Sequence, residues 1–131
     1  MSTTVLLDTH AFLWAIRQPQ KLSTTVRSLL ADRTNDVIVP SLVPWELSIK
    51  YRIGKLPEAE PVLVDYSTNL TRLGASSLSI SHTHTLHAGL MTWHHRDPFD
   101  RLLAAVAIVE GLPLVSKDTI FDEVPELQRM W

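Results

Sequence analysis

Short apolar runs alternate along the chain with longer segments in which apolar residues recur at helical spacing. Apolar runs of the length of buried strands occur at residues 3–7 and 36–40 and within residues 113–118. Residues 76–81, with the sequence SSLSIS, alternate with a period of two, and the pattern allows one more short strand near the C-terminus. These runs predict the strands of one sheet.

Helical spacing predicts a pair of helices between each strand and the next. In chain order the helical segments are residues 9–17, 23–32, 41–54, 61–73, 82–93 and 100–110. Ser23 and Ser41 are predicted N-caps, and Gly74 and Gly111 directly follow two of the predicted helices. This order predicts an α/β sandwich around a mainly parallel sheet, and we expect residues 1–131 to form a single domain.

Composition narrows the class of protein. The chain has 131 residues and a formal net charge of −2. It has no cysteine, which excludes a disulfide scaffold and a zinc–thiolate site. The N-terminus lacks the basic and long apolar segments of a signal peptide. No apolar run approaches the roughly 18 residues of a membrane span. We therefore expect a cytoplasmic protein with no membrane partner.

Four acidic residues fall where a parallel sheet binds its ligands, beyond the carboxyl ends of the strands. Asp8 directly follows the first strand, and Asp118 closely follows the last clear one. Glu46 lies in the first turns of the helix after the second strand, and Asp100 begins the helix that leads to the last clear strand. We expect these four carboxylates to meet in one cleft.

Each acid also has a purely structural interpretation. Asp8 is placed to cap the helix that begins at residue 9, and Asp118 is placed to form a turn. Glu46 and Lys50 have the i, i+4 spacing of a helical ion pair. Asp97, in the sequence DPFD, matches an N-cap followed by proline, and we favour that role for it.

Clustered carboxylates need a compensating charge, and the hard cations Mg²⁺ and Mn²⁺ match oxygen ligands. The chemistry that uses such cations is phosphoryl transfer. Basic residues that could hold a phosphate backbone stand near the acids in the sequence, namely Lys50, Arg52, Lys55, Arg96, Arg101 and Lys117. Among them Arg101 is the preferred substrate contact, with Lys50 and Arg96 as further predictions.

Histidine and tryptophan residues give weaker signals. His82, His84, His87, His94 and His95 crowd one stretch of the chain, but no cysteine completes a familiar zinc spacing. His94 or His95 is placed to touch RNA or to cap the following helix, and neither is expected to be the base. The tryptophans are expected in the core or at an interface.

Four sequence motifs together resemble the VapC-like PIN domains, the toxins of bacterial toxin–antitoxin pairs. They are LLDTHAFLW, PWELSIKYRIGKL, HHRDPFDRLLAAVA and LVSKDTIFD, and they occur in the order expected for that family. The resemblance covers nearly the whole chain and implies a three-layer α/β/α fold. Carried over by position, the family's acids fall on Asp8, Glu46, Asp100 and Asp118. The motif favours Asp100 over Asp97, and Asp122 takes a peripheral position.

The resemblance also implies an activity and partners. Members of the family are metal-dependent ribonucleases, which implies an endoribonuclease that uses Mg²⁺, with Mn²⁺ as a substitute. We expect Asp8 and Asp100 to be the direct ligands of the metal. It implies a cognate VapB-like antitoxin, a homodimer, and promoter DNA bound only through the antitoxin. A transfer or ribosomal RNA is the implied substrate. Ser116 stands where the family more often has threonine.

Other functions remain open at the level of sequence. A haloacid-dehalogenase-like phosphatase would need a second aspartate at position 10, where this chain has histidine. A phospho-receiver domain would need an aspartate after a middle strand, and VIVPS supplies none. An interaction module without catalysis, in which the acids only cap helices, and a nuclease for structured DNA are the remaining alternatives.

Overall fold

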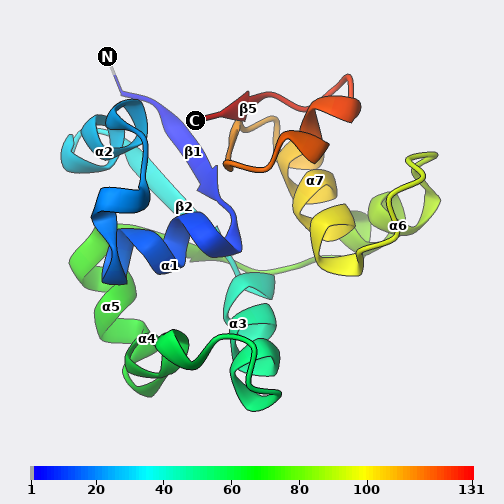
Figure 1. Ribbon diagram of the computed structural model, residues 1–131. Helices are drawn as coiled ribbons and strands as arrows, with labels where there is room; N and C mark the ends of the chain where they lie inside the picture. Colours follow the sequence, from blue (N-terminus) through cyan, green and yellow to red (C-terminus); the bar gives the residue numbers. More distant parts are fainter. Residues whose placement is uncertain (1) are drawn as a thin grey trace.

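The computed structural model describes residues 2–131 and contains a five-stranded sheet in the order β3-β2-β1-β4-β5 (Figure 1). All neighbouring strands pair in parallel. The strands are β1 (Thr4–Leu7), β2 (Asp36–Pro40), β3 (Ala75–Leu78), β4 (Leu114–Val115) and β5 (Arg129–Met130). The predicted parallel sheet is confirmed, including the weakly patterned third strand and the short C-terminal one.

The helices between the strands follow the predicted order. They are α1 (Thr9–Arg17), α2 (Thr24–Ala31), α3 (Leu42–Arg52), α4 (Glu60–Val64), α5 (Tyr66–Leu73), α6 (His82–Leu90) and α7 (Pro98–Glu110), with short 3₁₀ turns η1 (Pro19–Lys21), η2 (Pro57–Ala59) and η3 (Thr119–Glu123). Within residues 2–131, no helix is both long and apolar enough to cross a membrane.

Two predicted helices differ from the observed ones. The helix expected over residues 61–73 is two helices, because Asp65 (φ −137°, ψ 60°) ends α4 and precedes α5. The helix expected to reach residue 93 ends at Leu90, because Met91 has an extended conformation (φ −62°, ψ 143°). The chain therefore crosses from α6 to α7 through a longer irregular segment than the sequence predicts.

The strand order accounts for the layers. From β1 the chain moves outward to β2 and β3, and it then returns to place β4 on the other side of β1. Because crossovers between parallel strands are right-handed, this reversal puts the later helices on the opposite face of the sheet. Accordingly α1, α2, α4 and α5 lie on one side of β1, and α6 and α7 lie on the other (Figure 1). The three-layer α/β/α fold is confirmed.

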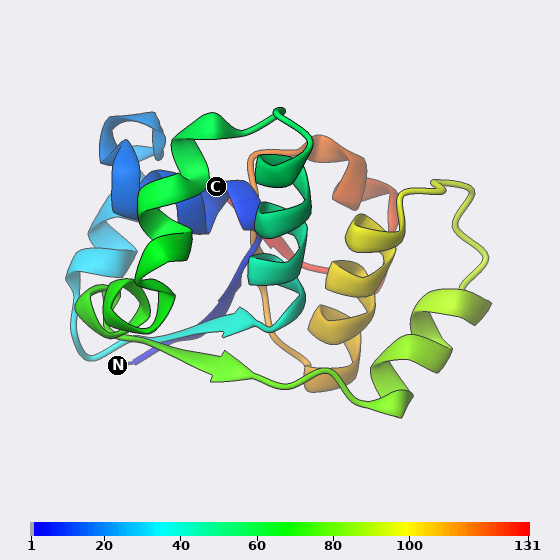
Figure 2. The same cartoon turned by 90° about the horizontal axis from the view of Figure 1, so that it is seen from below.

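The core is built around β1. Val5, Leu6 and Leu7 are fully buried, as expected for a central parallel strand covered on both faces. Phe12 of α1 is also fully buried, and the small residues Ala104 and Ala105 are fully buried on α7. Figure 2 shows the same arrangement from below, with β2 and β3 running side by side. This packing fixes the sheet edge from which the candidate site is built.

Candidate active site

The sheet holds two of the predicted acids at one edge. Asp8 directly follows β1, and Asp118 comes three residues after Val115, the last residue of β4. Because β1 and β4 are hydrogen-bonded neighbours in which Leu7 pairs with Val115, both chains leave the sheet at the same place. The Asp8 N–H donates to the Val115 carbonyl at 3.1 Å, which extends the ladder to the acid itself.

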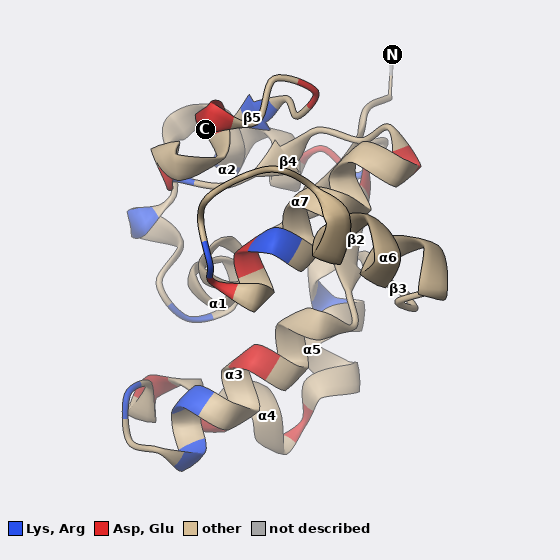
Figure 3. Cartoon of the chain, turned by 90° about the vertical axis from the view of Figure 1, so that its right-hand side faces the viewer, with Lys and Arg blue, Asp and Glu red and all other residues tan. Residues whose placement is uncertain are grey.

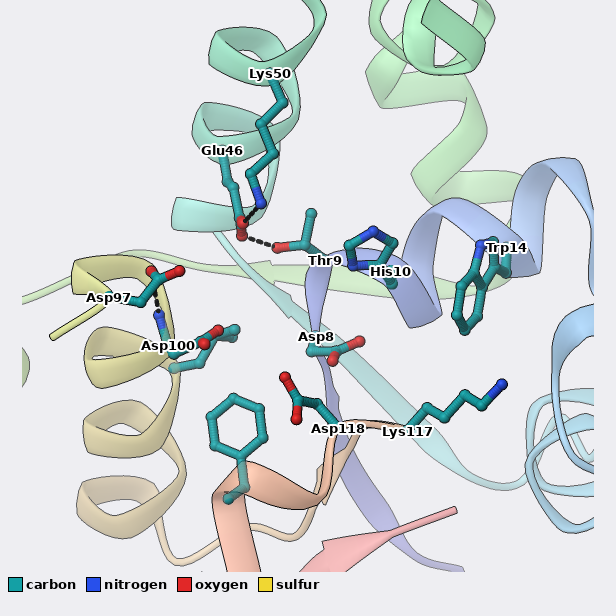
Figure 4. A pocket seen from close by; sticks show the side chains of 12 residues that line it. Asp8, Thr9, His10, Trp14, Glu46, Lys50, Asp97, Asp100, Lys117 and Asp118 are labelled. Carbon is teal, nitrogen blue, oxygen red and sulfur yellow. Dashed lines mark hydrogen bonds and ion pairs between the residues drawn. The ribbon is translucent and has the colours of Figure 1, made fainter. Parts of the chain in front are cut away.

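Two helices bring the other acids to the same place. Glu46 lies on α3, and Asp100 lies in the first turn of α7. Asp8, Glu46, Asp100 and Asp118 all line one open cavity of about 370 Å³ (Figure 4). The remaining lining residues are Thr9, His10, Trp14, Lys50, Asp97, Leu103, Lys117 and Phe121. The structure thus brings together all four acids that the sequence singled out.

Asp8 both caps a helix and lines the cavity. Its carboxylate accepts a hydrogen bond of 2.8 Å from the Ala11 N–H, so the capping interpretation also holds. The residue is only 8% exposed, and burial raises its pKa to about 6. Hydrogen bonds from Ser116 and Ala11 work against this rise in pKa, and the charges of Glu46 and Asp118 add to it.

Asp97 and Asp100 differ in role: Asp97 caps α7, and Asp100 contacts a histidine side chain. Asp97 caps α7 by accepting hydrogen bonds from the N–H groups of Phe99 (2.9 Å) and Asp100 (3.2 Å). Asp100 Oδ2 lies 2.7 Å from Nε2 of His95. Burial raises the pKa of Asp100 to about 6 against the hydrogen bond from His95. One atom each of His95, Asp97 and Asp100 lie within 4.8 Å of one another, close enough to share a cation.

Glu46 has both carboxylate oxygens engaged. The Thr9 hydroxyl donates to Oε1 at 2.5 Å, and the Lys50 ammonium lies 2.5 Å from Oε2. The predicted i, i+4 ion pair is therefore present, although Glu46 is only 4% exposed. Sequence reasoning missed Thr9, and the available signal was its position directly after Asp8 in LLDTHAFLW.

Asp118 begins the 3₁₀ turn η3, where its carboxylate accepts a hydrogen bond of 3.0 Å from the Ile120 N–H. The Asp118 N–H in turn donates to Oγ of Ser116 at 3.1 Å. Ser116 is fully buried, and its hydroxyl accepts this hydrogen bond. Asp118 therefore forms the turn predicted from the sequence and also lines the cavity.

Basic residues stand beside the acids on both helices, as Figure 3 shows for α3 and α7. Lys50 and Lys117 line the cavity. Arg96 is exposed between His95 and Asp97 and is not among the lining residues. His10 does line it, and burial together with the charge of Lys50 lowers its pKa, which favours a neutral ring at pH 7.

Arg101 is not among the residues that line the cavity, and backbone carbonyls bind its guanidinium. Its guanidinium donates to the backbone carbonyls of Ala88, Met91, Trp93 and His95. These bonds use four of the five N–H donors of the side chain. Arg101 therefore supports the chain between α6 and α7, and its contact with a substrate stays a prediction.

Comparison with known proteins identifies the family of the chain and agrees with its fold. The chain matches the PIN domain family over residues 5–127. It is 31% identical over 119 residues to Ribonuclease VapC22 of Mycobacterium tuberculosis, a match that covers 88% of each protein. It is 38% identical over 61 residues to Ribonuclease VapC16 of the same organism, which covers 47% of this chain and only 43% of that protein.

Solved structures share the fold at lower identity. VapBC2 from Rickettsia felis, bound to a DNA fragment from its promoter, gives a TM-score of 0.71 at 22% identity over 98% of each chain. DNA-bound VapBC from Salmonella typhimurium gives 0.70 at 15% identity over 99% of this chain and 98% of that one. With the match to the family over residues 5–127, these findings confirm that the chain belongs to the PIN domain family and resembles its VapC members.

Proposed function

We propose that the protein is the toxin of a toxin–antitoxin pair and acts as a metal-dependent endoribonuclease that hydrolyses RNA phosphodiester bonds. The observation that carries the proposal is the convergence of Asp8, Glu46, Asp100 and Asp118 on one cavity of a PIN domain. The names of the two curated relatives, both ribonucleases, support the same reaction.

The donor set of the cavity fits a hard divalent cation. The four acids supply only oxygen atoms, which Mg²⁺ and Mn²⁺ prefer. Burial raises the pKa of both Asp8 and Asp100 to about 6, so their ionised forms gain from an added positive charge. A divalent cation held there would supply the Lewis acid that activates water and offsets charge on the phosphate. Asp8 and Asp100 are the proposed direct ligands, with Glu46 and Asp118 completing the set directly or through water.

Three of the remaining lining residues, Thr9, Lys50 and Lys117, would position the acids or the RNA. The hydroxyl of Thr9 and the ammonium of Lys50 hold the Glu46 carboxylate in one orientation. Lys117 lines the opposite part of the cavity beside Asp118, where its charge can attract a phosphate (Figure 4). Lys50 and the exposed Arg96 are retained as proposed substrate contacts.

The proposed partners follow from the same likeness. The two solved neighbours are VapBC complexes bound to DNA, which supports a VapB-like antitoxin that carries the contact with promoter DNA. The proposed substrate is a transfer or ribosomal RNA, recognised through exposed bases and local shape. A homodimer and a cytoplasmic location complete the proposal.

A cleavage assay tests the function. Purified protein free of antitoxin is incubated with total cellular RNA and Mg²⁺, with EDTA and Asp100→Asn as controls. Asp97→Asn is the matched variant, because it changes a neighbouring carboxylate whose oxygen caps α7. Discrete fragments that disappear with EDTA and with Asp100→Asn, but persist with Asp97→Asn, support the proposal. Folded protein that cuts no RNA in Mg²⁺ or Mn²⁺ contradicts it, and a DNA substrate in parallel tests the structured-DNA alternative.

A further inference from the structure

The segment between α6 and α7 is tied to α7 by one side chain. Arg101 donates to the carbonyls of Ala88 (3.0 Å), Met91 (2.7 Å) and His95 (3.0 Å), and also to that of Trp93. The guanidinium of Arg101 thus fixes the backbone from Ala88, near the end of α6, to His95. Because Arg101 directly follows Asp100, the segment is held against the helix turn that presents this acid.

The fixed segment places the ring of His95 against Asp100. The Trp93 and His95 ring centroids lie 4.9 Å apart with the planes tilted by 46°. His95 Nε2 is 2.7 Å from Asp100 Oδ2, and the His95 and Asp100 side chains are 27% and 22% exposed. The His95 residue is therefore held at its carbonyl by Arg101, at one ring face by Trp93, and at its Nε2 by Asp100.

We propose that His95 is a positioning residue for Asp100: its Nε2–H donates to Oδ2 and would leave Oδ1 available to bind a divalent cation. Arg101 keeps His95 in place by fixing the backbone of the segment. The inference rests on the proposed function, because it treats Asp100 as a metal ligand. Carboxylates that bind metals are commonly oriented by such hydrogen bonds, and removing the donor typically weakens metal binding by about 10- to 100-fold.

The alternative, in which His95 is itself a ligand together with Asp97 and Asp100, fits the geometry less well. His95 Nε2 is already directed at Asp100 Oδ2, at hydrogen-bond distance. Asp97 Oδ1 already accepts two backbone N–H groups at the start of α7. A cation bound through His95 Nε2 and Asp100 Oδ2 would have to displace the hydrogen bond between them.

Metal titration of three variants tests the inference. His95→Phe keeps a ring of similar size and removes the donor, whereas His95→Gln places an amide N–H near the position of Nε2. His94→Phe is the matched control, because the His94 side chain is 82% exposed and its nearest charged partner, Glu123, is 3.7 Å away. The affinities for Mn²⁺ and for Mg²⁺ are measured by calorimetry, and melting temperatures are measured in EDTA.

We expect His95→Phe to lower the affinity for both cations by about tenfold or more. The affinities of His95→Gln should stay close to those of the parent protein, and those of His94→Phe should not change. An unchanged affinity of His95→Phe would overturn the inference. A loss of affinity for Mn²⁺ without a loss for Mg²⁺ would also overturn the inference. Nitrogen ligands favour Mn²⁺, so this result would make His95 a direct ligand.

Two further outcomes are distinguishable. If His95→Phe does not melt cooperatively in EDTA, His95→Asn replaces it, because its shorter amide leaves Oδ2 without a donor, and the same weakening is expected. If the parent protein binds neither cation, the proposed function fails and the inference fails with it. If the parent binds both and neither donor-free variant differs, only the inference fails.

Discussion

The Thr9 hydroxyl donates a hydrogen bond of 2.5 Å to Oε1 of Glu46, which links the first residue of α1 to α3. The two residues are 37 positions apart in the sequence, and both are buried. Because Thr9 directly follows Asp8, this contact also couples the position of one predicted metal ligand to another. Hydrogen bonds between side chains therefore position the acids of the cavity, in addition to the backbone of the strands and helices that carry them.

Replacing Thr9 by valine, which has nearly the same shape, removes the hydrogen bond and leaves the packing. We expect the Mg²⁺ concentration needed for half-maximal RNA cleavage to rise by about tenfold, because Glu46 loses a fixed orientation. Unfolding should be easier by only about 1 kcal/mol. Thr9→Ser, which keeps the donor, is the control, and equal Mg²⁺ dependence for valine and serine would contradict the role.

The stability of the metal-free protein should fall as the pH rises. The pKa of Asp8 is raised from an ordinary value of 3.8 to about 6, so between these values the folded state binds more protons than the unfolded state. The free energy of unfolding in EDTA should therefore decrease from pH 4 to pH 7. Asp8 alone contributes at most about 3 kcal/mol to this decrease. Urea unfolding at several pH values measures it.

Asp8→Asn should remove much of that pH dependence. Asparagine retains an oxygen that can cap α1 and carries no charge, so the variant should be more stable than the parent at pH 7 and no more stable at pH 4. RNA cleavage should be lost. A variant that shows the same slope of stability against pH as the parent would show that Asp8 is not the titrating group.

Divalent cations should reverse the destabilisation. A ligand that binds only the folded state stabilises it by about 2.7 kcal/mol when its concentration is 100 times its dissociation constant. We expect Mn²⁺ to raise the melting temperature of the parent at pH 7 and to have little effect on Asp100→Asn. Equal shifts in the two proteins, measured by calorimetric scans, would place the bound cation elsewhere.

Arg101→Met should destabilise the protein although the side chain carries no ion pair within residues 2–131. The change removes the donor from four backbone carbonyls while retaining the aliphatic stem, and we expect a loss of about 2–3 kcal/mol in denaturant unfolding. Arg96→Met is the comparison, because Arg96 is exposed and should leave stability unchanged.

The rim position of the four acids could be predicted because it follows from a single rule. Parallel strands share a carboxyl edge, so residues that end β1 or closely follow β4 must meet whatever the loops do. Asp97 and Asp100 were separable because the N-cap has a recognisable sequence, with proline in the next position.

Contacts that depend on the path of an irregular segment were not predictable. No glycine or proline lies next to Asp65, where α4 ends and α5 begins, and Gly89 lies inside the last turn of α6 rather than after its end at Leu90. The partners of Arg101 are backbone carbonyls, which every residue carries, so no sequence pattern indicates that its donors are engaged in this way. His95 was similarly ambiguous, because only the course of residues 91–95 brings its ring to Asp100.

The place of β4 beside β1 has a consequence for synthesis on the ribosome. Translation produces Asp8 early, but the strand that pairs next to it and the adjoining Asp118 come after residue 113. N-terminal parts of a chain can begin to fold while the rest is made. A nascent chain can therefore pair β1 with β2 and β2 with β3 and still lack one wall of the cavity, which closes only when the last strands join the sheet.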